Sequence, residues 1–154
     1  MRAQVDEECV IKANSQFWEQ MLAMTLEPLP VTEKFCVDAG HILGSVDLSG
    51  VWKGRIEVRL GEGLAYSAAA AMLMQPVETV GEADTLDAIK EIANMIAGVI
   101  KSSLPRPCAM TVPASAVEAQ GYCCPPRTED TLSVIFRHTA GDLMVRVWEQ
   151  ECLE

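Results

Sequence analysis

One segment of the chain, residues 84–104, carries apolar side chains around almost all of a helical surface. Its sequence reads DTLDAIKEIANMIAGVIKSSL, with apolar residues three and four apart, which is the period of an α-helix. Asp84 fits the N-cap position, and Pro105 and Pro107 follow the last helical residues. We therefore expect one long helix that is largely enclosed. Its predicted core face contains Leu86, Ile89, Ala93, Ile96, Ile100 and Leu104, and Ile92, Met95 and Val99 widen it.

A polar stripe interrupts this apolar surface and consists of Asp87, Glu91, Asn94 and Gly98. These positions are spaced i, i+4, i+7 and i+11, so they lie on one face of the helix. Because two carboxylates and a carboxamide are costly to bury, we expect the stripe to face solvent and to meet a partner. Glycine costs about 1 kcal/mol relative to alanine in a helix, and the missing side chain of Gly98 would allow a close approach.

Ordinary structural roles also explain parts of the polar stripe. Asp87 lies three residues after Asp84, so it is explained equally well as an N3 acid favoured by the helix dipole. Glu91 is also explained as a solvated helix acid. Asn94 is harder to explain in this way because asparagine is a poor helix former, although the spacing E-x-x-N occurs by chance in many helices.

The chemistry of the polar stripe suits hydrolysis of a phosphoryl group that another protein holds. An exposed carboxamide such as that of Asn94 can accept one hydrogen bond from a water and donate another, which would hold the water oxygen in line with an electrophile. A carboxylate one turn earlier, Glu91, can engage a lysine of the partner. The chain has no P-loop, no serine-nucleophile motif and no clustered metal ligands that would support self-contained chemistry.

The remaining segments predict strands and helices in blocks, without strict βαβ alternation. This order favours an α+β fold, a mainly antiparallel sheet with helices packed on one face. Residues 51–60 alternate in polarity, so one strand face is expected to be wet and the other packed, with Gly54 at a bulge or close contact. The other expected elements are helices at 5–24 and 67–74, strands at 32–46 and 108–114, a loop at 121–130, and a hairpin of 131–138 with 143–149.

Length and charge limit the classes of function. A chain of 154 residues favours a single domain, residues 1–154. The net charge of −10 would repel nucleic acid and acidic membrane surfaces, so neither is expected as a partner. No apolar run reaches the length of about 18 residues that a membrane span needs, and the N-terminus lacks an apolar signal region. We therefore expect a protein that is neither secreted nor membrane-spanning.

The cysteines do not predict a metal site. Six occur, at positions 9, 36, 108, 123, 124 and 152, with no C-x-x-C pair and only two histidines in the chain. We interpret them as reduced thiols of a cytoplasmic protein. The alternative is redox or metal sensing by the adjacent Cys123 and Cys124, although no histidine or thiolate-stabilising cluster accompanies them. Two tryptophans in expected strands, Trp52 and Trp148, are candidates for a dimer contact.

Several stretches resemble the CheC/CheX/FliY family of chemotaxis phosphatases, and in particular its CheX-like members. They are DAIKEIANMIAGVIKSSL, the upstream GSVDLSGVWKGRIEV and AAAAMLM, and the later MTVP. The family signature is an acidic residue or serine, three residues, glutamate, two residues, asparagine, and a proline further on. Asp87, Glu91 and Asn94 match its helical part in order and spacing. Pro113 is the candidate proline, although it follows Asn94 at a shorter distance than in the family.

The resemblance implies a CheC-like α+β fold and a phosphatase that hydrolyses the phosphoaspartate of a CheY-type receiver domain, in chemotaxis or another two-component pathway. Asn94 would orient the attacking water, Glu91 would pair with the receiver's active-site lysine, and Asp87 and Gly98 would contact the partner. The chain would need no cofactor or metal of its own, because Mg²⁺ belongs to the receiver, and it would form a homodimer by sheet pairing. The alternative is a non-catalytic module of the same fold that binds a receiver.

Overall fold

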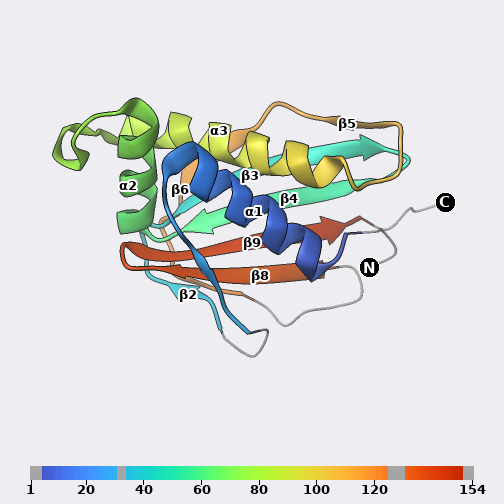
Figure 1. Ribbon diagram of the computed structural model, residues 1–154, viewed down its shortest axis with the longest axis horizontal. Helices are drawn as coiled ribbons and strands as arrows, with labels where there is room; N and C mark the ends of the chain where they lie inside the picture. Colours follow the sequence, from blue (N-terminus) through green and yellow to red (C-terminus); the bar gives the residue numbers. More distant parts are fainter. Residues whose placement is uncertain (1–4, 31–33, 125–130, 151–154) are drawn as a thin grey trace.

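The fold consists of an antiparallel sheet with helices on one of its faces (Figure 1). The computed structural model describes residues 5–30, 34–124 and 131–150. The helices are α1 (Glu7–Leu22), α2 (Glu62–Leu73) and α3 (Glu82–Lys101), with a 3₁₀ turn at Val77–Thr79. The strands are β1 (Glu27–Pro28), β2 (Cys36–Val37), β3 (Ile42–Gly50), β4 (Gly54–Leu60), β5 (Cys108–Met110), β6 (Ala114–Val117), β7 (Tyr122–Cys123), β8 (Thr131–His138) and β9 (Gly141–Glu149).

The main sheet has the strand order β1-β8-β9-β4-β3-β5, and β6 also pairs with β3. Its strand pairs are antiparallel, including the predicted hairpin, in which β8 and β9 pair from Thr131 opposite Trp148 to His138 opposite Gly141. A second, two-stranded sheet joins β2 to β7. The predicted α+β class with an antiparallel sheet and helices on one face is confirmed.

Alternation along the central strands separates the two faces of the sheet. In β4, Ile56, Val58 and Leu60 are completely buried and point toward the helices. Arg55 and Arg59 point to the opposite side, which we call the outer face. This face is not uniformly wet, because Glu57 between the two arginines is only 4% exposed. The expectation of one wet strand face is therefore wrong at Glu57.

Two expected strands are broken in the structure. The stretch 32–46 does not form one strand, because Gly40 adopts a left-handed φ of 91° and turns the chain between β2 and β3. The stretch 108–114 divides into β5 and the start of β6, with Pro113, which lacks a backbone donor, between them. The expected loop 121–130 contains β7 at its beginning, and residues 125–130 of it lie outside the described residues.

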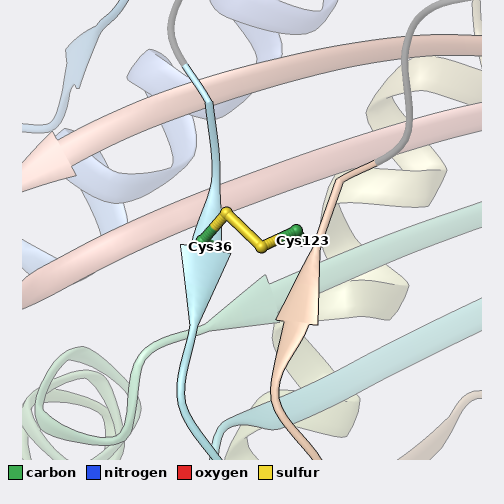
Figure 2. Close-up of a disulfide and its surroundings, with 2 residues drawn as sticks. All are labelled: Cys36 and Cys123. Atoms are coloured by element: carbon green, nitrogen blue, oxygen red, sulfur yellow. A yellow bond between two sulfur atoms is a disulfide. The ribbon is translucent and has the colours of Figure 1, made fainter.

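The expectation of six reduced thiols is wrong. Cys36 in β2 and Cys123 in β7 form a disulfide (Figure 2). Cys9, Cys108 and Cys124 stay outside disulfides, and Cys152 lies outside the described residues. The pairing follows from the fold, because β2 and β7 place Cys36 directly opposite Cys123 although the two are 87 residues apart in sequence.

The predicted long helix is present as α3, but it begins two residues earlier than expected. Gly81 is its N-cap, so Asp84 is not the capping residue and lies in the first helical turn. No helix in the described part of the chain is both long and apolar enough to cross a membrane.

Gly44 in β3 lets α3 approach the sheet closely. A Cβ atom built at Gly44 would lie 2.9 Å from Ile89 Cγ2 and 3.0 Å from the Ile89 carbonyl oxygen, both on α3. On the neighbouring strand, the hydroxyl of Ser115 donates a hydrogen bond of 2.7 Å to the carbonyl of Leu86. These contacts fix the position of α3 over β3 and β6.

Substitution at Gly44 should test this constraint. We expect Gly44→Ala to lower the free energy of unfolding by about 1–3 kcal/mol, because the added methyl group would displace α3 or Ile89. Urea unfolding followed by circular dichroism measures the change. The matched control is Gly98→Ala, which should not lower the free energy of unfolding because an added Cβ meets open space there. A Gly44→Ala variant as stable as the wild-type protein would show that the close approach is not required.

Candidate functional site: the exposed face of α3

Most of the circumference of α3 is enclosed by the rest of the protein. The helix contacts β3, β4 and β6 of the sheet and both other helices. Its buried residues are Thr85, Ala88, Ile89, Ile92, Ala93, Ile96, Ala97 and Ile100. Helices held on several sides have little freedom to rotate, because core side chains are close-packed. The backbone positions of the residues on the remaining face are therefore fixed.

The polar stripe lies on this remaining face. Asp87 and Glu91 are exposed, and Asn94 and Gly98 are half-buried at its edge. Glu91 and Asn94 form no side-chain hydrogen bond or ion pair with the residues that the structure describes. α3 therefore presents one carboxylate and one carboxamide, a single turn apart, to whatever approaches from solvent.

Asp87 has a different environment from the one that helix capping would give it. Because α3 begins at Glu82, Asp87 lies beyond the first turn and is not an N3 residue, so the capping explanation is wrong. Its carboxylate lies 3.9 Å from Lys90 Nζ, and the Asp87 side chain is 80% exposed. Such an exposed i,i+3 pair contributes little to stability, so Asp87 keeps its carboxylate accessible.

Gly98 lies between two hollows. One, of about 450 Å³, is bounded by α1 and α3, and the other, of about 480 Å³, is bounded by the end of α3 and the start of β5. No atom outside the helix would lie within 4 Å of a Cβ at Gly98. Packing among the described residues therefore does not require glycine here. The missing side chain allows another molecule to approach the helix backbone closely at this point.

The hollow between α1 and α3, which we call the α1–α3 groove, is largely apolar. Met95 and Val99 line it and are 36% and 45% exposed, so the expectation that they widen the buried core is wrong. Met21 of α1 lines the opposite side and is 59% exposed. The helical period around Met21 and Val99 predicts apolar faces, but not which apolar residues the crossing of the two helices leaves uncovered. The groove is lined by Ala13, Gln16, Phe17, Gln20, Met21, Met95, Gly98 and Val99.

A cluster of charged side chains occupies the outer face of the sheet, and sequence reasoning did not identify it. Glu57, whose side chain is 5% exposed, lies 3.8 Å from Arg55 Nη1 and 3.9 Å from Arg59 Nε. Arg55 also donates to Asp47 through Nε at 2.7 Å and Nη2 at 3.3 Å. This hydrogen bonding to Asp47 is the main cause that raises the pKa of Arg55. Arg146 faces Glu57 from β9 and stacks on Trp148 at 4.8 Å.

Tyr122 of β7 covers part of this charged cluster. Its ring lies 3.8 Å from the guanidinium carbon of Arg59, and Arg59 Nη1 lies 2.9 Å from His41 Nε2. Burial is the main cause that raises the pKa of Tyr122, and the positive charges of Arg146 and Arg59 oppose the shift. The cluster is on the opposite side of the sheet from α3, so it does not contribute side chains to the polar stripe.

Other sequence candidates are not brought together with the polar stripe. Pro113 is half-buried between β5 and β6. Cys123 is in the disulfide on β7, and Cys124 is outside it. Among the described residues, no group of three or more His, Cys, Asp or Glu side chains is arranged to hold a metal ion.

Comparison with known proteins identifies the fold. The solved structure of chemotaxis protein CheX from Vibrio vulnificus has a TM-score of 0.76 at 18% identity, over 97% of this chain and 100% of that one. CheX in the CheX-CheY-BeF3-Mg complex from Borrelia burgdorferi gives 0.69 at 18% identity, over 94% and 97%. FliY from Thermotoga maritima gives 0.60 at 13% identity, over 94% and 91%. At these identities the likeness concerns the fold alone.

Comparison of the sequence with family models identifies the family, which the structural likeness alone does not. No curated protein sequence matches the chain. The family model described as "Chemotaxis phosphatase CheX" matches residues 42–137, a range that runs from β3 to β8 and contains all of α3 with the polar stripe. The chain therefore belongs to the CheX family of chemotaxis phosphatases.

Proposed function

We propose that this protein is a phosphatase that hydrolyses the phosphoaspartate of a CheY-type receiver domain. The observation that carries the proposal is the polar stripe itself. Glu91 and Asn94 stand one turn apart on the accessible face of a helix whose other sides are enclosed. They have no side-chain partner among the described residues. Polar groups that are accessible on a fixed helix and have no partner in the described part of the chain fit a role in another protein's site.

In the proposed reaction, Asn94 positions a water molecule. Its carboxamide oxygen accepts a hydrogen bond from the water, which holds the water oxygen in line with the phosphorus of the receiver's phosphoaspartate. The water oxygen forms a bond to phosphorus while the bond from phosphorus to the aspartate oxygen breaks. The products are the aspartate carboxylate and inorganic phosphate, and the proton of the water leaves with phosphate or solvent.

Glu91 fixes the docking register in this proposal. Its carboxylate pairs with the lysine of the receiver's active site, and Asp87 gives a second, weaker contact one turn earlier. The Mg²⁺ ion that stabilises the phosphoryl charge belongs to the receiver, so this chain needs no metal of its own. The net charge of −10 also favours approach to a cleft that contains a lysine and a divalent cation.

The α1–α3 groove supplies the apolar part of the proposed interface. A specific interface buries about 800 Å² on each partner, which is more than three side chains of the polar stripe can provide. The exposed Met95, Val99 and Met21 lie next to Gly98, and they offer the apolar surface that such a contact needs.

Comparison supports the nature of the partner. The Borrelia burgdorferi neighbour was solved as a complex of CheX with CheY, BeF3 and Mg²⁺. We also propose that the protein is a cytoplasmic homodimer formed by sheet pairing, because the family resemblance implies this state. The pathway is chemotaxis or a related two-component pathway.

A second candidate function is a module that binds the receiver without hydrolysing it. The apolar α1–α3 groove favours this candidate, because it would serve docking whether or not a water is activated. The two functions separate when binding and phosphate release are measured on the same variants. Tight binding of wild-type protein to an activated receiver with an unchanged phosphate lifetime would support the module.

Substitution of the polar stripe tests the phosphatase directly. With a phosphorylated CheY-type receiver and Mg²⁺, we expect Asn94→Ala to lower the rate of phosphate release by about 10²-fold, because the water loses its positioning group. We expect Glu91→Gln to raise the receiver concentration that gives the half-maximal rate, because the substitution removes the ion pair with the lysine. The release of inorganic phosphate is measured at several receiver concentrations.

Two controls keep this test specific. Glu82→Gln changes another exposed glutamate of α3, one that lies in the first turn, and should leave the rate unchanged. The thermal unfolding temperature of every variant should stay close to that of the wild type, because Glu82 and Glu91 are exposed and the half-buried Asn94 has no side-chain partner among the described residues. Full activity in both Asn94→Ala and Glu91→Gln would refute the assignment of these residues.

Gly98 is tested by two substitutions, one that measures stability and one that measures binding. Gly98→Ala should raise the free energy of unfolding by up to about 1 kcal/mol, because alanine is the better helix former and the site has open space. Gly98→Leu should weaken binding to a receiver activated with beryllofluoride, as measured by calorimetry, because the side chain fills the clearance for the partner. Equal affinity of Gly98→Leu and wild type would remove Gly98 from the interface.

A further inference from the structure

The disulfide closes a short ribbon made of two segments that are far apart in the chain. β2 and β7 pair antiparallel with Cys36 opposite Cys123, and each strand is two residues long. One further hydrogen bond, 2.8 Å from the Cys124 amide to the Phe35 carbonyl, extends the pairing. An isolated two-stranded ribbon is at best marginally stable in water. The Cys36–Cys123 bond and the packing of the ribbon against the sheet therefore hold these segments in place together.

The two faces of the ribbon have different environments. Phe35, Tyr122 and Cys124 face inward and contact a small apolar cluster with Ile135 and Met144 of the sheet's outer face. Cys36 and Cys123, which alternate with these residues along the chain, are exposed. Figure 2 shows the sulfur–sulfur bond bridging the two strands. A dissolved thiol can therefore reach this bond without unfolding the core.

The ribbon also covers charged groups that are otherwise hard to keep buried. Tyr122 lies over Arg59, which contacts Glu57 and His41. The Glu57 side chain is only 5% exposed, and one of its carboxylate oxygens has no hydrogen bond among the described residues. Detaching the ribbon would give this cluster access to water, which lowers the cost of holding the charges. Opening the ribbon would therefore hydrate the charged cluster and would also expose the apolar cluster around Phe35.

We propose that Cys36 and Cys123 form a reversible thiol–disulfide exchange site, whose reaction partner is a dithiol reductant and whose reduction releases the β2–β7 ribbon. A thiolate of the dithiol attacks one sulfur of the Cys36–Cys123 bond, which breaks and leaves a mixed disulfide. The second thiolate of the reductant displaces the remaining cysteine. Two electrons and two protons pass to the protein, giving two thiols, and the reductant becomes a disulfide.

The geometry selects one pairing among the neighbouring cysteines. The Cys124 thiol points to the inner side of the ribbon, where it donates to the Ser133 hydroxyl at 3.5 Å. It stays outside the disulfide, although it is adjacent to Cys123. The exchange site therefore contains Cys36 and Cys123, and Cys124→Ser is a matched control that leaves it intact.

Peptide mapping of the full chain tests the pairing. The protein is equilibrated in a buffer of reduced and oxidised glutathione, alkylated without further reduction, and digested. We expect a cross-linked peptide pair that contains Cys36 and Cys123, reversed by dithiothreitol. It should persist in Cys124→Ser and disappear in Cys36→Ser and in Cys123→Ser. Alkylation of Cys36 and Cys123 throughout the glutathione series, or a bond between Cys123 and Cys124, would overturn the proposal.

Hydrogen exchange tests the release of the ribbon. Reduction with dithiothreitol should speed exchange of the Cys124 amide, which is bonded to Phe35, by more than about tenfold through local opening. Amides of Ile92 and Ile96 in α3, on the other side of the sheet, should keep their rates. Cys124→Ser should show the same response to reduction. An unchanged exchange rate across β2 and β7 after complete reduction would contradict the release.

Discussion

The close approach of α3 to β3 at Gly44 is the constraint on which the rest of the structure depends. A residue with a side chain at this point would meet Ile89 at a distance that packed atoms do not adopt. With the helix seated there, its apolar residues fill the space between the sheet and the two other helices. Because the other sides of α3 are in these contacts, the polar stripe faces solvent. Its side chains start from a rigid element, so little conformational freedom is lost when they meet a partner.

The two faces of the sheet carry separate chemistry. The helical side presents Glu91 and Asn94 beside an apolar groove, and we propose that it meets a receiver domain there. A phosphoaspartate beside a metal ion and a lysine already has most of its charge stabilised, so a visiting protein needs to add only a positioned water and a docking register. The outer face carries a charged cluster around Glu57 and a ribbon closed by Cys36 and Cys123. The proposed phosphatase and the proposed exchange site therefore use different surfaces and can be tested independently.

Sequence patterns predicted the parts of the fold that depend on local periodicity. The long helix, the β8–β9 hairpin and the antiparallel α+β class follow from spacing and turn residues. Strands β2 and β7 have two residues each, too few to show a period, so neither they nor the Cys36–Cys123 pairing could be read from the sequence. The polar stripe was identified from spacing alone. The exposure of Met95 and Val99 and the burial of Glu57 depend on how distant elements cross, which local patterns do not specify.

The most direct test of the central claim is a crystal structure of this protein with a CheY-type receiver activated by beryllofluoride and Mg²⁺. The account predicts that α3 lies against the receiver's active site. The Asn94 carboxamide should then lie beside the beryllofluoride, where a water can sit in line, and Glu91 should lie within ion-pair distance of the receiver's lysine. A complex in which the receiver binds the outer face of the sheet, with the polar stripe left in solvent, would contradict it.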